Sequence, residues 1–351
     1  MQDFFIFKHL KQSNPDMRKL FLFSLAFSLL FFGCKSSAKS GTEPSKPERE
    51  PITAILDIAG LNAASSVELK ETVSYLTSDA LQGRATGTPG IEMAAKYLES
   101  KLETYNIKPY FETYRDHFTV KEKPACNIVG FIEGNDEKLK NEVVIIGAHY
   151  DHIGFGKKVG NDSIANGAND NATGTSAVLA LAKYLSAVKN NKRSVMVAFF
   201  SAEEMGLLGS KHLANKLHSE NIDLYTVINI EMVGVPFKDR DYVAFLTGYE
   251  LSNMAEKINE YVGEKLIGAS DVSKKYGLFR ASDNYPFYEV FKLPSHTISS
   301  CDLSNYDHYH QVGDEADKQD YEHMARLVNK LVPAVVAICN TPSKEIVMND
   351  E

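Results

Sequence analysis

Short runs of consecutive apolar residues alternate with longer amphipathic segments over most of the chain. Six of the runs are rich in β-branched and aromatic side chains, which is typical of strands. They are CNIVGFI (126–132), EVVIIGAHY (142–150), SVMVAFF (194–200), TVINIEMV (226–233), YVAFLTG (242–248) and PSHTISS (294–300). Because most of them are continuous apolar runs rather than alternating ones, the strands are expected to be covered on both faces.

The segments between these runs have the apolar spacing of helices. Residues 52–110 show it, most clearly in GIEMAAKYLESKLETYN (90–106), which follows the glycine-rich turn GRATGTPG (83–90). The apolar face of that segment consists of Ile91, Ala94, Ala95, Leu98 and Leu102. A closing helix is expected over Gln319–Cys339. Strands alternating with helices predict an α/β fold, a three-layer α/β/α sandwich with a mostly parallel mixed central sheet.

The composition is that of an ordinary globular protein. With 351 residues and 44% hydrophobic content, the chain can bury a sizeable core. Lys and Arg together number 38 against 46 Asp and Glu, which gives a net charge of −8. No basic run stands out beyond the first few residues, so we expect no nucleic-acid partner.

The N-terminal region has the pattern of a targeting segment. MRKLFLFSLAFSLLFFGCKSS begins at Met17 with two basic residues, continues through a short apolar stretch and reaches Cys34. This resembles a bacterial lipoprotein signal, which predicts removal of residues 1–33, membrane attachment through a lipidated Cys34 and a location in the bacterial cell envelope. A plain cleaved signal or an uncleaved anchor is the alternative. Residues 34–51 are predicted to be a flexible tether and residues 52–345 the folded domain.

The three cysteines that follow Cys34 are Cys126, Cys301 and Cys339. An odd number permits at most one internal disulfide. Their spacing matches neither a zinc ribbon nor a CxxC redox motif, so a structural role is expected for all three.

Polar side chains follow several predicted strands, where sheets of this type gather their active sites. His149 and Asp151 lie in IIGAHYDHIG and stand two residues apart, a spacing that places both side chains on one face of a strand. A carboxylate can accept a proton from one imidazole nitrogen and leave the other nitrogen to bind a metal. The pair therefore indicates a metal-binding histidine with an orienting carboxylate.

Further acidic groups stand at other strand ends and turns. Asp170 lies in the turn NGANDNATG before a helix, where an aspartate alone would be read as a helix cap. The adjacent Glu203 and Glu204 follow SVMVAFF, and Glu231 follows the apolar run INI. His310 lies in the loop before the last helix. Carboxylates seldom stand so close to a core without partners, so their joint placement favours a metal site over separate structural roles.

In this order the motifs HYD, NDN, EE, NIEM and YHQVGD resemble metallopeptidase family 28, the co-catalytic di-zinc aminopeptidases of clan MH. The similarity runs from Leu76, where LTSDALQGRATGTPG resembles the lead-in of the family, to the C-terminal helix. The combination is specific, although no single motif is. The resemblance implies that residues 52–345 form a zinc peptidase domain. The expected activity is that of an aminopeptidase, which hydrolyses N-terminal residues from peptides through a metal-bound hydroxide and a glutamate general base.

The resemblance also implies a set of five metal ligands. His149 would bind one zinc ion, Asp170 would bridge two, and Glu204 with His310 would complete the other site. Glu231 would complete the first site, where the family usually has aspartate. One extra methylene displaces that carboxylate by about a bond length, whereas zinc–oxygen distances are fixed near ~2.0–2.2 Å. Two zinc ions are expected, with the occupancy of the Glu231 site left open.

Three catalytic residues are implied in the same way. Glu203 would be the general base, Asp151 would orient His149, and Tyr309 would stabilise the oxyanion. The neighbouring His152 and His308 are expected to line the cleft and not to bind metal, because Asp151 and His310 match the family pattern better.

A less specific likeness concerns RASDNYPFYEVF, where Ser282 and Asp283 resemble a stretch that often reads SDH in the family. Asn284 stands in place of that histidine. The segment is therefore expected only to form a wall of the substrate pocket.

Two other functions remain open from the sequence. A glutaminyl cyclase-like acyltransferase would use a single zinc, bound by the residues that match Asp170, Glu204 and His310; the glutamate at 231 is compatible with this, and His149 argues against it. A catalytically silent peptide-binding module would have no need of the unligated Glu203. Carboxypeptidase or dipeptidase specificity is also open.

Overall fold

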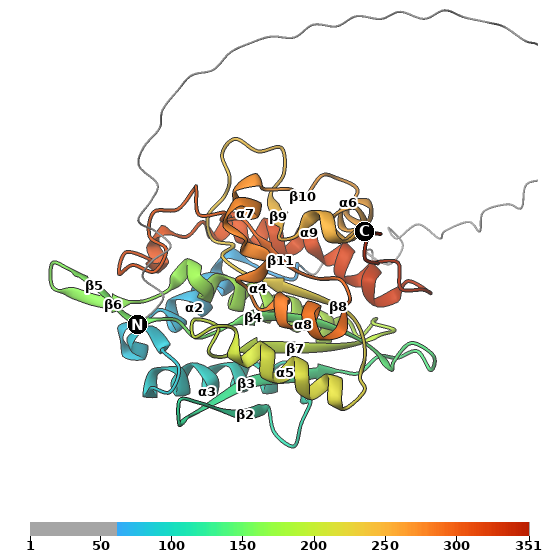
Figure 1. Cartoon of the computed structure of the whole chain (residues 1–351), viewed down its shortest axis with the longest axis horizontal. Helices are drawn as coiled ribbons and strands as arrows, with labels where there is room; N and C mark the ends of the chain where they lie inside the picture. The colour runs from blue at the N-terminus through green and yellow to red at the C-terminus, as the bar shows by residue number, and fades with distance from the viewer. Residues whose placement is uncertain (1–61, 351) are drawn as a thin grey trace, which may run out of the picture. The chain divides into compact units, whose positions relative to one another are not determined.

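A nine-stranded sheet organises residues 62–350, the part of the chain that this computed structural model describes (Figure 1). The strand order is β1-β3-β7-β4-β8-β11-β9-β10, with β2 paired to β3. The strands are β1 (Lys108–Pro109), β2 (Arg115–Val120), β3 (Lys123–Ile132), β4 (Glu142–His149), β7 (Ser194–Phe200), β8 (Asp223–Ile230), β9 (Ala244–Leu246), β10 (Ile267–Gly268) and β11 (Ser295–Ser299). The predicted signal, the lipidated Cys34 and the tether lie outside the described residues.

The four central strands are parallel to one another. β4 pairs in parallel with β7 on one side and β8 on the other, and β8 pairs in parallel with β11. The pairs β1–β3, β2–β3, β3–β7 and β9–β11 are antiparallel, and β9–β10 is parallel. The predicted mixed sheet is therefore confirmed. Its central strands end at one edge, which brings together the residues that follow them.

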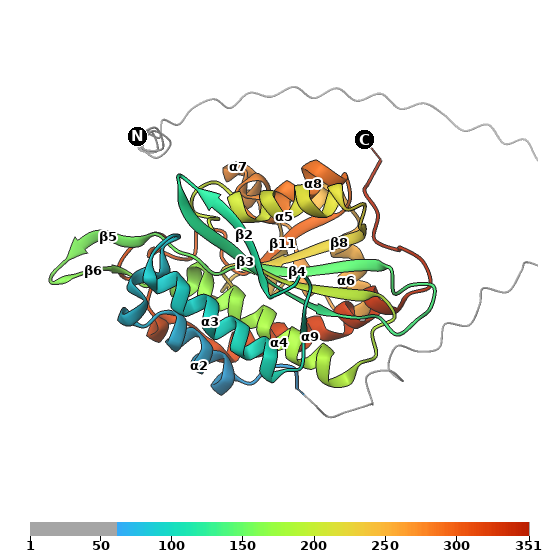
Figure 2. The ribbon, with the colours of Figure 1, turned by 90° about the horizontal axis from the view of Figure 1, so that it is seen from below.

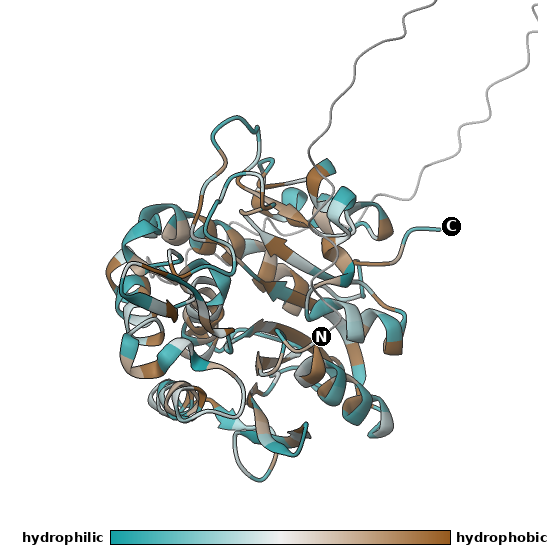
Figure 3. Ribbon diagram, turned by 60° about the vertical axis from the view of Figure 1, so that its left-hand side comes forward, coloured by the Kyte–Doolittle hydropathy of each residue, from teal (hydrophilic) through white to brown (hydrophobic). Residues whose placement is uncertain are grey.

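Alternate residues of the central strands enter two separate hydrophobic cores, because successive side chains of a strand point to opposite faces. In β7, Val195, Val197 and Phe199 belong to the larger core. Met196, Ala198 and Phe200 belong to the smaller one. Figure 3 shows the central strands as hydrophobic, which agrees with burial on both faces.

Helices cover both faces of the sheet (Figure 2). The larger core is closed by α2 (Ser66–Leu76), α3 (Pro89–Thr104), α4 (Gly174–Val188) and α9 (Tyr321–Asn340). The smaller core is closed by α5 (Leu208–Ser219) and α8 (Asn284–Phe291). Of the two remaining α-helices in the described range, α6 (Met254–Val262) packs against α9, and the short α7 (Asp271–Tyr276) follows β10. This is the predicted α/β/α sandwich.

Local signals fix where the helices begin. Pro89 occupies the first turn of α3, directly after the glycine-rich turn. The closing helix starts two residues later than predicted, at Tyr321, because the side chain of Asp320 accepts a hydrogen bond from the His323 N–H and caps it.

A hairpin that the sequence pattern does not predict, β5 (Gly154–Val159) with β6 (Asp162–Ala165), projects from the sheet in Figures 1 and 2. Its residues are mostly exposed and include Gly and Lys, so no apolar run marks them. The predicted helical region 52–110 contains only α2 and α3 as α-helices within the described residues; from 105 onward the chain turns into β1.

Cys126, Cys301 and Cys339 are buried free thiols. Their burial agrees with the structural role predicted for them. Among residues 62–350, no helix combines the length and the apolar character that crossing a membrane requires.

Candidate metal centre

The carboxyl ends of the parallel strands bring the predicted metal ligands together. His149 is the last residue of β4, Glu204 follows the end of β7, and Glu231 directly follows β8. Asp170 reaches the same edge from the irregular turn before α4, and His310 reaches it from the loop before α9. The placement follows from topology, because parallel neighbours present their carboxyl ends to one crevice.

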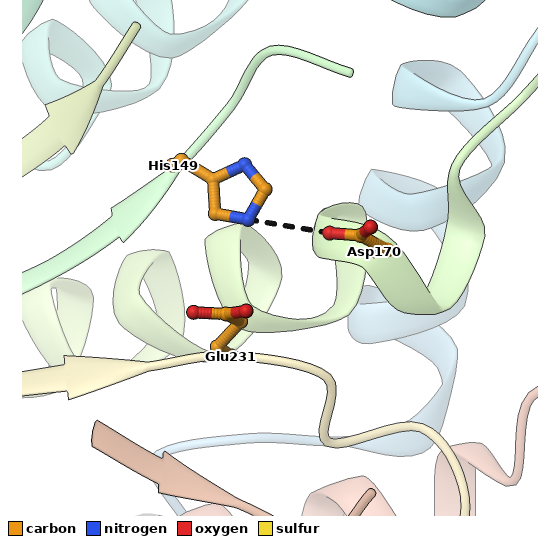
Figure 4. Close-up of side chains that lie close together, drawn as sticks. All are labelled: His149, Asp170 and Glu231. Atoms are coloured by element: carbon orange, nitrogen blue, oxygen red, sulfur yellow. Dashed lines mark ion pairs between the residues drawn. The ribbon is translucent and has the colours of Figure 1, made fainter. Parts of the chain in front are cut away.

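His149, Asp170 and Glu231 form one group (Figure 4). Asp170 Oδ1 lies 3.3 Å from His149 Nε2. Each residue offers one nitrogen or oxygen atom, and these atoms all lie within 4.8 Å of one another. The longer side chain of Glu231 therefore still reaches the group, although the family usually has aspartate at this position.

A second group shares Asp170 with the first. It contains His152, Asp170 and Glu204, whose ligand atoms also lie within 4.8 Å of one another. His310 joins it, with Nε2 3.2 Å from Asp170 Oδ2 and 2.9 Å from Glu204 Oε2. Sequence analysis predicted Asp170, Glu204 and His310 here but assigned His152 only to the cleft wall.

The unpartnered atoms of this pocket show that a metal fits it. Among the buried atoms that have no hydrogen-bond partner in the described residues are these five of the two groups: His149 Nε2, His152 Nδ1, Asp170 Oδ2, Glu204 Oε1 and His310 Nε2. Burying polar atoms without partners is costly, and buried polar groups in native proteins are nearly always satisfied. These nitrogen and carboxylate oxygen atoms face one another and are the donors that zinc accepts.

Burial pushes several carboxyl groups of the pocket toward their neutral form. Desolvation raises the pKa of Asp151 to about 6, and those of Glu231 and Asp283 to about 7, against the opposing effect of the positive charge on His149. It raises the pKa of Glu203 well above the ordinary value, and Glu204 and Glu231 raise it further. A cation bound in the pocket would favour the ionised form of these carboxyl groups.

The pKa values of the predicted ligands Asp170 and His310 are shifted in the direction opposite to the one that burial favours. Burial opposes ionisation of Asp170, but the close imidazoles of His149 and His310 hold its pKa well below the ordinary value. Burial likewise lowers the pKa of His310, but Asp170 and Glu204 outweigh this and raise it to about 10. The carboxylates thus favour the protonated, positively charged form of the imidazoles beside them. A bound metal cation would replace that positive charge.

Asp151 does not bond to His149 through its carboxylate, as the sequence analysis expected. The carboxylate Oδ1 lies 3.8 Å from His149 Nδ1, whereas the main-chain oxygen of Asp151 lies 3.3 Å from it. The carboxylate instead accepts hydrogen bonds from the Glu203 N–H and the Thr86 hydroxyl. The reason is that β4 ends at His149, so the strand alternation behind the expectation does not extend to Asp151.

Tyr309 and Ser282 flank the pocket. The Tyr309 ring stacks on His310 with centroids 3.9 Å apart and, like Glu231, lines a small pocket. Ser282 donates a hydrogen bond to Glu231 Oε2 and itself accepts one from Asn229. Ser282 was expected only to form a pocket wall, but in the structure it holds a predicted ligand in place.

Arg84, in the glycine-rich turn, is a buried cation that the sequence analysis did not single out. Its side chain is fully buried and donates to five main-chain oxygens. They belong to Leu76, Tyr150, Asn166, Gly167 and Asp170, at 2.5–3.4 Å. Burial lowers the pKa of Arg84 to about 10, with Asp170 and Asp314 opposing, so the group stays charged at neutral pH. It ties the segment after β4 to the turn that carries Asp170.

Two further side chains fix that turn. Asp314 accepts hydrogen bonds from the main-chain N–H groups of Asn169 (2.8 Å) and Asp170 (3.0 Å). Asn171 donates to the Ile230 carbonyl and accepts from the Met232 N–H, 3.1 and 3.0 Å away, on either side of Glu231. The ligands are therefore held through the backbone that carries them, which preorganises the pocket.

Fold and pocket together define a class, the metal-binding α/β proteins whose ligands gather at the carboxyl ends of parallel strands. Residues 127–335 match peptidase family M28. The chain is also 30% identical over 241 residues to aminopeptidase YwaD of Bacillus subtilis, an alignment that covers 67% of this chain and 47% of YwaD. The chain therefore belongs to peptidase family M28, and it spans about half the length of this curated relative.

Solved structures share the fold. BSAP, a zinc aminopeptidase from Bacillus subtilis, superposes with a TM-score of 0.62 and 16% identity over 82% of this chain and 98% of BSAP. The Bacteroides thetaiotaomicron glutaminyl cyclase bound to N-acetylhistamine gives a TM-score of 0.57 and 19% identity over 78% of this chain and 97% of the cyclase. At these identities the likeness establishes architecture, and the activity must be argued from the site.

Replacing Arg84 with lysine tests its role in the pocket. A single ammonium group cannot reach five carbonyls, so several buried oxygens lose their donors. We expect Arg84→Lys to lower the free energy of unfolding by about 2–5 kcal/mol and to weaken zinc binding by roughly 10–100-fold. Chemical denaturation and chelator competition measure the two effects.

Arg115→Lys is the matched control, because Arg115 bonds to the carboxylates of Glu92 and Glu99 at the surface of α3. It should leave zinc affinity unchanged. Wild-type zinc affinity in Arg84→Lys would contradict the role assigned to Arg84.

Proposed function

We propose that this protein is a zinc-dependent exopeptidase that removes N-terminal residues from peptides. The observation that carries the proposal is the cluster of five unpartnered nitrogen and oxygen atoms beside Glu203. Membership of the M28 family and the fold shared with a zinc aminopeptidase support it.

Two ions fit the donor set better than one. The two groups of ligand atoms meet at Asp170, which offers Oδ1 to His149 and Oδ2 to His310. A carboxylate shared in this way is what a pair of neighbouring cations requires. We therefore propose His149, Asp170 and Glu231 as ligands of one zinc ion, and Asp170, Glu204 and His310 as ligands of the other.

When bound, zinc supplies a Lewis acid that polarises a peptide carbonyl and lowers the pKa of water. Glu203 is the residue placed to move a proton, because Ser282 holds Glu231 and the histidines flank Glu204, whereas Glu203 has no such partner. Burial raises the pKa of its carboxyl, which brings it closer to the range that a general base needs. Glu203 would accept the proton of the attacking water and pass it to the leaving amine.

The charge of the site favours an amino terminus over a carboxyl terminus. The small pocket beside Glu231 is lined by both apolar and hydroxyl side chains, and its lining contains no lysine or arginine that could receive a terminal carboxylate. Arg84 already donates to five main-chain oxygens. A substrate ammonium group would instead meet the acidic side chains gathered around Glu203, so an aminopeptidase is the activity we propose.

The cell-envelope location is a separate proposal that rests on the sequence alone. The lipoprotein-like segment ending at Cys34 and the polar residues 35–51 support membrane attachment through a lipid.

Substituting Glu203 with glutamine separates proton transfer from metal binding. Glutamine keeps the shape but cannot accept the proton, so kcat on an aminoacyl chromogenic substrate should fall by about 10²–10⁴-fold, with zinc content unchanged. Glu204→Gln is the matched control and should lose zinc as well as activity. Chelation should abolish wild-type activity and zinc should restore it. Full activity of the Glu203→Gln protein would refute the assignment.

A peptide panel distinguishes the rival functions. We expect release of the first residue from peptides with a free N-terminus and no reaction with N-blocked ones, because the ammonium group is what the carboxylates recognise. Exclusive cyclisation of N-terminal glutamine would establish the glutaminyl cyclase alternative, and release of C-terminal residues a carboxypeptidase. Binding without turnover would establish a peptide-binding module. Mass spectrometry of the products separates the three reactions, and a binding measurement with the unreacted peptides identifies the fourth outcome.

A further inference from the structure

His152 is the buried imidazole of the pocket that the proposed ligand set leaves out. It stands directly after Asp151 in the segment that follows β4, and only 1% of its surface is exposed. Neither ring nitrogen has a hydrogen-bond partner among the described residues. A neutral imidazole buried without a partner is costly, so its position requires a cause.

The ring is directed at Glu204. His152 Nδ1 lies 2.9 Å from Glu204 Oε1 and 3.8 Å from Asp170 Oδ2. His310 approaches the other oxygen of the same carboxylate, Oε2, at 2.9 Å. Two ligands at about 2.1 Å from one zinc ion lie roughly 3.4 Å apart in a tetrahedral site, so these separations are those of atoms that share an ion.

The surrounding backbone is shaped to hold this ring. Gly167 has φ +60° and packs against His152, where an added Cβ would lie 2.4 Å from the ring Cγ. The main-chain oxygen of the same glycine accepts a hydrogen bond from Arg84, 2.6 Å away. The glycine therefore serves two needs, the left-handed conformation and the close approach of the imidazole. A side chain at position 167 would therefore displace either this ring or the turn that carries Asp170.

We propose that His152 binds the zinc ion at Asp170 and Glu204 through Nδ1. The proposal rests on the zinc centre proposed above and deepens it. The residues that would hold this ion then number four, His152, Asp170, Glu204 and His310, which is the number typical of a closed site. The residues that would hold the other ion number three, His149, Asp170 and Glu231.

The competing explanation is that His152 merely donates a hydrogen bond to Glu204. Aspartate and asparagine distinguish the two, because both place a side-chain atom close to the position of Nδ1. An aspartate carboxylate can bind the ion but can only repel Glu204. An asparagine amide can donate to Glu204 but is a weak zinc ligand. The order of zinc affinities among the variants therefore identifies the function of His152.

The experiment measures zinc stoichiometry and affinity of the full chain by competition with a chromophoric chelator. We expect His152→Ala to weaken the tighter ion by more than about 100-fold, beyond the roughly 10–100-fold typical of residues that only support a ligand. His152→Asp should recover most of that loss and His152→Asn little of it. His323→Ala is the matched control: that imidazole is also buried, but its charged neighbours are Asp320 and Arg326, so zinc binding should not change.

Wild-type zinc affinity in His152→Ala, or tighter binding by the asparagine variant than by the aspartate variant, would overturn the proposal. If the alanine variant fails to fold, the comparison of aspartate with asparagine decides alone. Failure of this proposal leaves wild-type zinc binding intact, whereas failure of the proposed function appears as a wild-type protein that binds no zinc, which overturns both.

Discussion

Mutual repulsion among carboxylates in one pocket is the constraint on which the site depends. Seven acidic groups are involved: Asp151, Asp170, Glu203, Glu204, Glu231, Asp283 and Asp314. Burial alone would neutralise them, and the raised pKa values of Glu203 and Glu231 show that tendency. Charged carboxylates persist here only where a cation or a hydrogen-bond donor compensates them. The ionised carboxylates of this pocket therefore require positive charge or hydrogen-bond donors beside them.

The scaffold supplies that compensation at three levels. Parallel strands deliver ligands from separate segments to one edge of the sheet. Arg84 provides a permanent buried cation that bonds only to main-chain oxygens, so it organises the turns without occupying the carboxylates. The histidines His149, His152 and His310 provide nitrogen atoms that face the acidic side chains and remain without other partners. The space between these nitrogen atoms and the carboxylate oxygens suits divalent ions.

Much of this could be predicted from the sequence, and the limits have physical causes. The strands were predictable because their apolar runs are continuous, and the ligands because they follow those strands. The environment of Arg84 was not predictable, because a single arginine in a glycine-rich turn gives no sign that five carbonyls surround it. His152 was missed because its direction depends on the irregular chain after β4 and on Gly167, which stands far from it in sequence. Asp151 was misread because strand alternation ends at His149.

The central claim is that zinc occupies the space enclosed by the unpartnered atoms. Anomalous diffraction at the zinc absorption edge, from crystals of the zinc-loaded protein, locates the ions without reference to activity. The account predicts two peaks about 3.5–4 Å apart on either side of Asp170, each about 2.0–2.2 Å from nitrogen or carboxylate oxygen atoms. A pocket without anomalous density, with zinc only at surface sites, would contradict it.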